Sequence, residues 1–247
     1  MKKLILTVAA VLAAGVFAMP AGFTDDWDAA LKKAAAEKKT VLALFTGSDW
    51  CIWCKRLEGE VLSQKAFSDE VGKTFVPVFL DFPSNESLVP AAVQKRNREL
   101  AEKFEVEGFP TVVLVDVKGL ELTRTGYKEG GPEKYLAHVL DLNRKGPDLQ
   151  KHLNPYDKRL KAVFKKLDRE VGAAVEKAGG DNKAKEAAAK AAVQKLSGAT
   201  IAELTKLRGE IDAEKVPDAI SDDKAELLKH LNGAIDFLTK ASKGQMP

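Results

Sequence analysis

The first half of the chain alternates between helix-like and strand-like patterns of apolar residues. Thr24 precedes two aspartates and is the expected N-cap of a helix over residues 27–38. The next segment, residues 40–45, is apolar almost throughout, which predicts a central strand covered on both faces. In the helix expected over residues 27–38, apolar residues recur with helical spacing on one face, at Trp27, Ala30, Leu31 and Ala34.

The same alternation continues to about residue 142. Pro77 places a second strand at an edge of the sheet or at a bulge, because proline cannot donate a ladder hydrogen bond. Residues 63–71 either extend the preceding helix or form a separate helical turn. The expected strands are 75–81, 111–115 and 120–125, the last two as a hairpin, and the expected helices end near residues 62, 104 and 142. This order predicts an α/β fold with a mixed sheet and helices on both faces.

Beyond residue 145 the pattern is helical only. The segment Lys145–Asp148 marks the change, and Thr200 with Glu203 forms a capping box that would open a new helix. Four helices with short connections predict a small all-α bundle. We therefore expect one domain at residues 19–145 and a second at 146–247. The four expected helices are 156–177, 182–196, 200–213 and one that begins at Ser221.

The most specific chemistry lies in Cys51-Ile52-Trp53-Cys54, which follows the strand at 40–45 and opens a helix. Cys51 would lie at the helix N-terminus, where unpaired N–H groups and the helix dipole favour an anion. A thiolate there is stabilised, and the thiolate is the form that attacks a disulfide. Cys54, one turn later, is within reach to close a disulfide and to release whatever Cys51 has captured.

Two other interpretations of the cysteine pair stay open. A zinc site needs about four ligands, whereas the chain has two cysteines and three scattered histidines, His138, His152 and His230. A purely structural disulfide closing so short a loop would remove little entropy from the unfolded chain. The redox interpretation is favoured over both, and neither a metal nor a cofactor is expected.

These residues resemble the thioredoxin superfamily, particularly exported thioredoxin-like proteins with a Gly-Ser-Asp-Trp-Cys-x-x-Cys stretch, over residues 23–143. The segment Gly108–Thr111 is similar to the family's loop whose proline, here Pro110, has a cis peptide bond and faces the dithiol. Gly126 is similar to the glycine of a loop that frames the substrate groove. The resemblance implies a thioredoxin-like fold in which the backbone of Phe109 pairs with a substrate chain.

The chain departs from the family pattern in two respects. The best-known members carry a buried aspartate in the strand before the dithiol, and the equivalent position here holds Leu44. Glu58 or Asp49 could substitute for it, although solvation at the surface is the favoured expectation for both. The dipeptide between the cysteines is Ile52-Trp53, which supplies no charge. The reduction potential therefore cannot be predicted from this dipeptide.

The first 18 residues have a basic start, an apolar stretch from residue 4, and the small residues Val16 and Ala18 before an expected cleavage site. The stretch is shorter than the ~20 residues that span a bilayer. We expect a cleaved signal peptide, no stable membrane anchor, and a periplasmic or secreted protein in which disulfides persist. The net charge of +3 gives no support to a nucleic-acid binder.

The predicted function is that of an exported thiol-disulfide oxidoreductase with protein substrates and an upstream redox partner. Cys51 is the expected nucleophile and Cys54 the expected resolving cysteine. The alternative is a substrate-binding or chaperone-like adaptor, whose helical domain binds a partner or forms a homodimer. The expected substrate-binding residues are Trp50, Ile52, Trp53, Phe109, Pro110 and Gly126; Trp50 could equally pack in the core.

Overall fold

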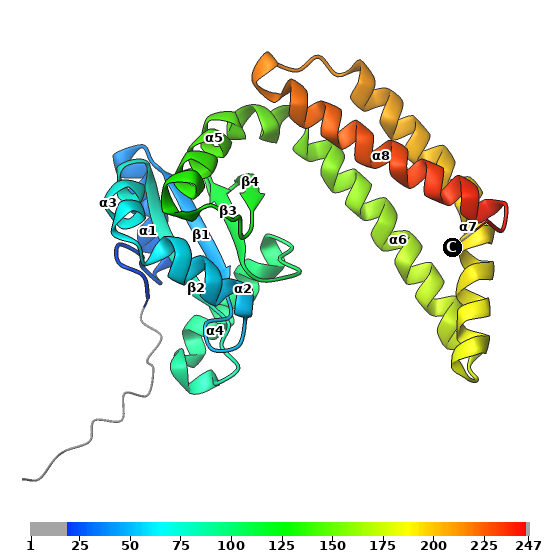
Figure 1. Cartoon of the computed structure of the whole chain (residues 1–247), viewed down its shortest axis with the longest axis horizontal. Helices are drawn as coiled ribbons and strands as arrows, with labels where there is room; N and C mark the ends of the chain where they lie inside the picture. Colours follow the sequence, from blue (N-terminus) through cyan, green and yellow to red (C-terminus); the bar gives the residue numbers. More distant parts are fainter. Residues whose placement is uncertain (1–18, 246–247) are drawn as a thin grey trace, which may run out of the picture. The chain divides into compact units, whose positions relative to one another are not determined.

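The computed structural model describes residues 19–245 (Figure 1). The predicted signal peptide, residues 1–18, lies outside this range. Over the range that is described, no helix combines the length and the apolar character needed to cross a membrane.

A four-stranded mixed sheet lies at the centre of the first half, with strand order β2-β1-β3-β4. Strand β1 pairs in parallel with β2 and antiparallel with β3, so that Leu44 lies between Phe79 and Val112. Strand β2 is at the edge, which suits Pro77 and confirms the expectation for this segment. The strand bounds are Thr40–Thr46 (β1), Phe75–Asp81 (β2), Thr111–Val115 (β3) and Glu121–Thr125 (β4).

Helices cover both faces of this sheet. Trp27 of α1 and Phe104, which follows α4, pack on the side chains of Val41, Ala43 and Phe45 in one core cluster. On the opposite face Phe67 of α3 contacts Tyr135 of α5, with ring centroids 6.2 Å apart. These helices are α1 (Trp27–Glu37), α2 (Ile52–Leu57), α3 (Lys65–Thr74), α4 (Ala91–Lys103) and α5 (Gly131–His152), with a 3-10 turn at Glu86–Leu88. Residues 65–74 are therefore a separate helix.

The N-cap of α1 is Asp26, so the expectation of Thr24 was wrong. The Asp26 carboxylate accepts a hydrogen bond from the Ala29 N–H at 2.9 Å. Thr24 is instead paired with the sheet edge: its N–H donates to Pro77 O, and its carbonyl accepts from Phe79 N at 2.8 Å. The backbone of Thr24 is thus engaged in sheet pairing three residues before the helix begins at Trp27.

The chain divides into two compact units. The first contains the chain up to Leu120 together with Arg124–Val139, and the second contains Glu121–Thr123 together with the chain from Leu140 onward. Helix α5 runs through both, so the expected helix end near residue 142 was wrong. It continues through Gly146 and Pro147 to His152. The domain limits at residues 18 and 145 stay predictions.

The second unit is all-helical apart from Glu121–Thr123. Its helices are α6 (Asn154–Ala178), α7 (Asn182–Ala213) and α8 (Ser221–Ser242), with a 3-10 turn at Asp218–Ile220. Residues 182–213 form one helix, so the helix start predicted at Thr200 was wrong. The hydroxyls of Ser197 and Thr200 donate to the carbonyls of Val193 and Leu196, four residues earlier, instead of capping a new helix. The core of α6, α7 and α8 contains Leu160, Val163, Leu204, Leu207, Ile211, Leu231 and Leu238.

Candidate functional site

The two cysteines lie where β1 leads into α2. Cys51 is the N-cap residue of α2, and its N–H donates to Gly47 O at 2.9 Å. Cys51 and Cys54 form a disulfide with their Cα atoms 5.2 Å apart. Both are buried, and Cys51, with 5% of its surface exposed, is slightly more accessible than Cys54, with 2%.

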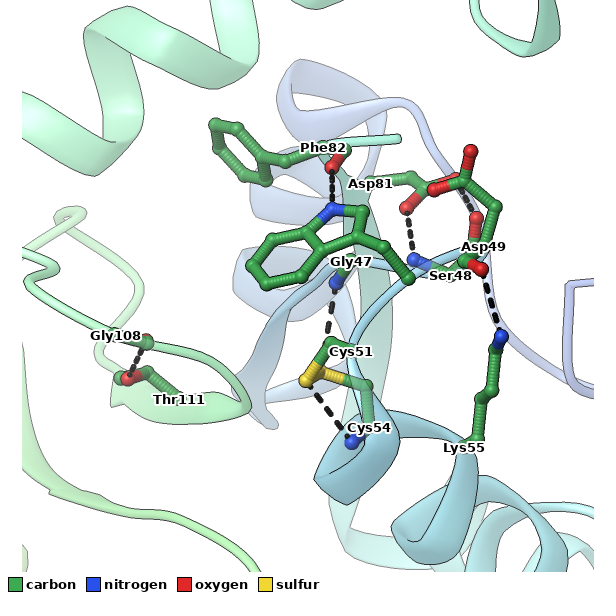
Figure 2. The surroundings of a disulfide bond; sticks show 11 residues. Gly47, Ser48, Asp49, Cys51, Cys54, Lys55, Asp81, Phe82, Gly108 and Thr111 are labelled. Atoms are coloured by element: carbon green, nitrogen blue, oxygen red, sulfur yellow. Dashed lines mark hydrogen bonds between the residues drawn. A yellow bond between two sulfur atoms is a disulfide. The ribbon is translucent and has the colours of Figure 1, made fainter. Parts of the chain in front are cut away.

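Backbone N–H groups are directed at both sulfur atoms (Figure 2). Cys54 N–H donates to Cys51 Sγ at 3.2 Å, and Gly47 N–H donates to Cys54 Sγ at 3.5 Å. Donors in these positions stabilise negative charge on sulfur when the disulfide is reduced. The first one favours a thiolate at Cys51 in particular, because Cys51 also lies at the positive end of the helix.

The turn between β1 and Cys51 is fixed by two aspartates. Asp81, at the end of β2, accepts hydrogen bonds from the Ser48 N–H at 3.0 Å and from the Ser48 hydroxyl at 2.6 Å (Figure 2). The Asp49 carboxylate accepts from the backbone N–H groups of Ser84 and Asn85, both at 2.8 Å. The bond from Asn85 is the largest influence on the Asp49 carboxyl and lowers its pKa. Asp49 is therefore not simply solvated, and it holds a neighbouring loop.

Glu58 is a partly buried acidic residue that lies four residues after Cys54. It follows Cys54 by one helical turn, at the start of a π-helical turn, Glu58–Leu62, that continues α2. Its Oε2 atom is buried and has no hydrogen-bond partner among residues 19–245. Burial, with the charge of Asp81 as a second cause, raises the pKa of Glu58 to about 7. The expectation that Glu58 is solvated at the surface was wrong, whereas Leu44 is buried in β1 as an apolar residue.

Asp81 is itself in a desolvated position. Burial raises the pKa of the Asp81 carboxyl, and the hydrogen bonds from Ser48 act in the opposite direction. The sequence carried a weak signal for both Asp81 and Glu58. Asp81 ends an otherwise apolar strand, and Glu58 lies at i+4 from Cys54, on the same face of the helix.

An aromatic cluster packs beside the Phe109–Pro110 peptide bond, which is cis as the resemblance implied. The Trp50 indole N–H donates to Phe82 O at 2.9 Å, and the Trp50 and Phe109 rings lie 5.8 Å apart. Trp50 is nevertheless 51% exposed, so it is a surface residue anchored at one edge. Gly126 lies against this loop, because a Cβ atom there would come within 3.1 Å of Pro110 O.

A second aromatic cluster involves the other tryptophan of the motif. The Trp53 and Tyr127 rings lie 5.5 Å apart, and the guanidinium of Arg56 is within 5.5 Å of the Trp53 ring and 5.3 Å of the Tyr127 ring. Sequence reasoning identified Trp53 but missed Arg56 and Tyr127. Nothing in the local pattern joins them, because 67 residues separate Tyr127 from its hydrogen-bond partner Glu60.

The structure thus brings most of the predicted site residues to one region around α2 and the Phe109–Pro110 loop. Ile52, between the cysteines, is 73% exposed, and Trp53 is 50% exposed. In the described part of the chain, no three histidine, cysteine or acidic side chains are grouped closely enough to hold a metal ion.

Comparison with known proteins identifies the first half of the chain. The family model described as "Thioredoxin-like domain" matches residues 27–142. Disulfide bond reductase DsbH of Chlamydia pneumoniae is 34% identical over 110 residues, which cover 44% of this chain and 66% of that protein. Thiol:disulfide interchange protein DsbD of Actinobacillus pleuropneumoniae serotype 5b (strain L20) is 31% identical over 99 residues, covering 39% of this chain and 15% of that protein.

A solved structure named DsbH Oxidoreductase is 28% identical, with a TM-score of 0.47, and the alignment covers 57% of this chain and 93% of that one. The chain spans no more than about two thirds of the length of the curated relatives, from 66% of DsbH down to 15% of DsbD. The matched family and the strand order agree with the fold expected from the sequence. Residues 27–142 of this chain are a thioredoxin-like domain.

Proposed function

We propose that this protein is an exported thiol-disulfide oxidoreductase that acts on protein thiols and disulfides. The observation that carries the proposal is the Cys51–Cys54 disulfide at the start of α2, with a backbone N–H directed at each sulfur. The names of the relatives, a disulfide bond reductase and a thiol:disulfide interchange protein, support the same chemistry. Export rests on the basic and apolar pattern of residues 1–18.

The reaction transfers two electrons between the dithiol and a substrate disulfide. The Cys51 thiolate attacks one sulfur of the substrate, a mixed disulfide forms, and the other substrate sulfur leaves as a thiolate that takes up a proton. Cys54 then loses its proton, and its thiolate attacks Cys51 Sγ. This step closes the Cys51–Cys54 disulfide and releases the second substrate thiol. In the reverse direction the protein oxidises a substrate dithiol, and the potentials of the partners decide which direction prevails.

Glu58 is the proposed acceptor of the Cys54 proton. Cys54 and Glu58 lie at i and i+4 on one helix face, and Cys54 is buried, so bulk water has poor access to its thiol. A carboxyl with a pKa of about 7 is suited to this role, since it can both accept and return a proton near neutral pH. Asp81 would tune Glu58 through its charge and would position the turn through Ser48.

Exposed and half-buried residues around the dithiol form the proposed substrate-binding surface. Apolar side chains there would contact the substrate, and the backbone of Phe109 would pair with it as a strand does. Its members are Trp50, Ile52, Trp53, Phe109, Pro110 and Gly126. A homodimer through the helical unit stays a proposal, as does a periplasmic or secreted location.

Trapping of mixed disulfides tests this function. A Cys54→Ser variant should accumulate covalent complexes through Cys51 with exported proteins, and these complexes should disappear on treatment with dithiothreitol. The matched control, Cys51→Ser, should trap far fewer, because the buried Cys54 is not the attacking sulfur. A Cys54→Ser protein that traps nothing, together with a wild-type protein that cannot reduce insulin, would contradict the proposal. That result would favour the adaptor function instead.

A further inference from the structure

A network of side chains joins the dithiol helix to the segment that follows β4. We propose that Arg56, Glu60 and Tyr127 are positioning residues. They hold Trp53 and the segment 126–131 in place at one side of the substrate-binding surface. This inference rests on the proposed function and adds residues that act through Trp53, without contact with the sulfur atoms.

Hydrogen bonds, cation–π contacts and an ion pair make the network. The Tyr127 hydroxyl donates to Glu60 Oε2 at 2.6 Å, and Arg56 Nε donates to Glu60 Oε1 at 2.7 Å, so one carboxylate holds both partners. The Arg56 guanidinium lies over the rings of both Trp53 and Tyr127, in the range of cation–π attraction. Arg56 also approaches Glu129 Oε1 at 3.7 Å, which adds a second link to the same segment.

The charges in the network stabilise these contacts at neutral pH. Hydrogen bonds from Tyr127 and Arg56 lower the pKa of Glu60, so its carboxylate stays ionised. The hydrogen bond to Glu60 raises the pKa of Arg56, which stays a cation. The network thus joins the Arg56 cation, which lies over two aromatic rings, to the carboxylates of Glu60 and Glu129. A conservative change at Arg56 or Tyr127 removes a defined part of it.

The segment after β4 needs such a restraint because of its composition. Gly130 and Gly131 both have positive φ angles, 126° and 79°, a conformation that glycine adopts at little steric cost. Lys128 and Glu129 are exposed. At the other end, the carbonyl of Gly126 accepts a hydrogen bond from the buried Tyr135 hydroxyl at 3.0 Å. Tyr127, together with the ion pair from Glu129 to Arg56, therefore links the segment to α2.

The two tryptophans of the motif are restrained in different ways. Trp50, just before Cys51, is anchored by its own N–H to Phe82 O. Trp53, just before Cys54, is held by rings and a cation that belong to other elements. A polypeptide substrate that contacts Trp53 would consequently depend on Tyr127 and Arg56, whereas a small disulfide that reaches only Cys51 would depend on them less.

Limited proteolysis tests the restraint independently of activity. Trypsin cleaves after lysine, and Lys128 is exposed in the middle of the segment. In the full chain, Tyr127→Phe, which removes only the hydroxyl, and Arg56→Lys, which removes the planar guanidinium, should speed cleavage after Lys128 several-fold. The control Tyr156→Phe also removes a hydroxyl bonded to a glutamate, Glu214, but lies in the helical unit. It should cleave as the wild type does.

Steady-state kinetics test the link to substrate binding. With insulin as the substrate, Tyr127→Phe and Arg56→Lys should raise KM by about threefold to tenfold at nearly unchanged kcat. With glutathione disulfide, the rise in KM should be smaller. Equal KM values for variant and wild type with insulin would overturn the inference. An equal loss of kcat on both substrates with a lower thermal midpoint would also overturn it, since that marks a merely structural role.

A failure of the proposed oxidoreductase function would give different results from a failure of the positioning role alone. If the wild type itself reduces neither insulin nor glutathione disulfide, the oxidoreductase proposal fails, and no substrate surface needs positioning. If the wild type is active and cleavage after Lys128 is equally slow in all four proteins, the positioning role alone is contradicted.

Discussion

The half-buried carboxyl of Glu58 affects both the proposed proton transfer at the site and the free energy of unfolding. Its pKa is raised to about 7, chiefly by burial, so the folded protein retains this proton at a pH where the unfolded chain, with a pKa near 4.5, has lost it. Between these two values, folding takes up a proton, and the free energy of unfolding falls as the pH rises. The loss is complete about one unit above pH 7, where Glu58 is ionised in the folded protein as well.

Replacement of Glu58 by glutamine should therefore stabilise the oxidised protein at pH 8 and have little effect at pH 4. The gain at pH 8 should be about 1 kcal/mol, after a discount for solvent screening of a carboxyl that is only half buried. Urea unfolding at both pH values measures it, with the exposed Glu226→Gln on α8 as a control that should show no pH-dependent gain. A gain of the same size at pH 4 and pH 8 would show that ionisation is not the cause.

Much of the site could be predicted from the sequence because its signals are local. The spacing of Cys51 and Cys54 after an apolar strand pointed to the redox pair, whereas the loop with Phe109 and Pro110 was expected from the resemblance to the thioredoxin superfamily. Glu58 was considered but placed wrongly at the surface, because its partial burial at the start of the π-helical turn is a tertiary effect that the local sequence does not show. Tyr127 was missed, since its partners lie on an element far away in the chain.

At the scale of elements, the strands and the first helices were predicted well, because a buried strand in a mixed sheet has a continuous apolar pattern. The two errors in the helical unit concern breaks that do not occur. Gly146-Pro147 and Ser197–Thr200 are typical helix-terminating residues, yet both lie inside helices. In α7 the hydroxyls are satisfied by carbonyls four residues earlier, and in α5 a tertiary contact requires the glycine.

Two of the helix-interior glycines, Gly146 and Gly198, should consequently respond to alanine in opposite directions. A Cβ at Gly146 would lie 2.9 Å from Leu122 Cβ, whereas a Cβ at Gly198 would meet nothing within 4 Å. Gly146→Ala should destabilise the protein by about 1–3 kcal/mol through overpacking. Gly198→Ala should stabilise it by about 0.5–1 kcal/mol, as alanine does in a helix. Thermal unfolding of the two variants tests these opposite changes in stability. Stabilisation by both substitutions would contradict the close approach at Gly146.

At the scale of the molecule, α5 continues past residue 145, where the sequence pattern predicts the boundary between the two domains. Beyond that point the helix supplies Gln150 Nε2, which donates to Glu121 O at 3.2 Å, and it is followed by Asn154, whose Nδ2 donates to Leu122 O at 2.9 Å. Both carbonyls belong to β4, the last strand of the sheet. A fragment that ends at the predicted boundary loses both donors.

A fragment of residues 19–155 should therefore be more stable than a fragment of residues 19–145. The difference should be about 1–2 kcal/mol, the contribution of two hydrogen bonds of ordinary strength. Urea unfolding of the two fragments measures it, with Gln150→Ala/Asn154→Ala in the longer fragment as the matched control. That double variant should behave like the shorter fragment. Equal stability of the two unmodified fragments would place the boundary where the sequence pattern put it.

The central claim is that Cys51 and Cys54 act as a reversible two-electron couple. The most direct test equilibrates the purified protein in glutathione and dithiothreitol buffers of graded ratio, alkylates the free thiols after acid quenching, and counts them by mass. We predict a single transition in which both thiols appear together, with the same curve from the oxidised and the reduced side. A disulfide whose oxidised fraction does not follow the buffer ratio, or does not re-form when the ratio is returned, would contradict the account.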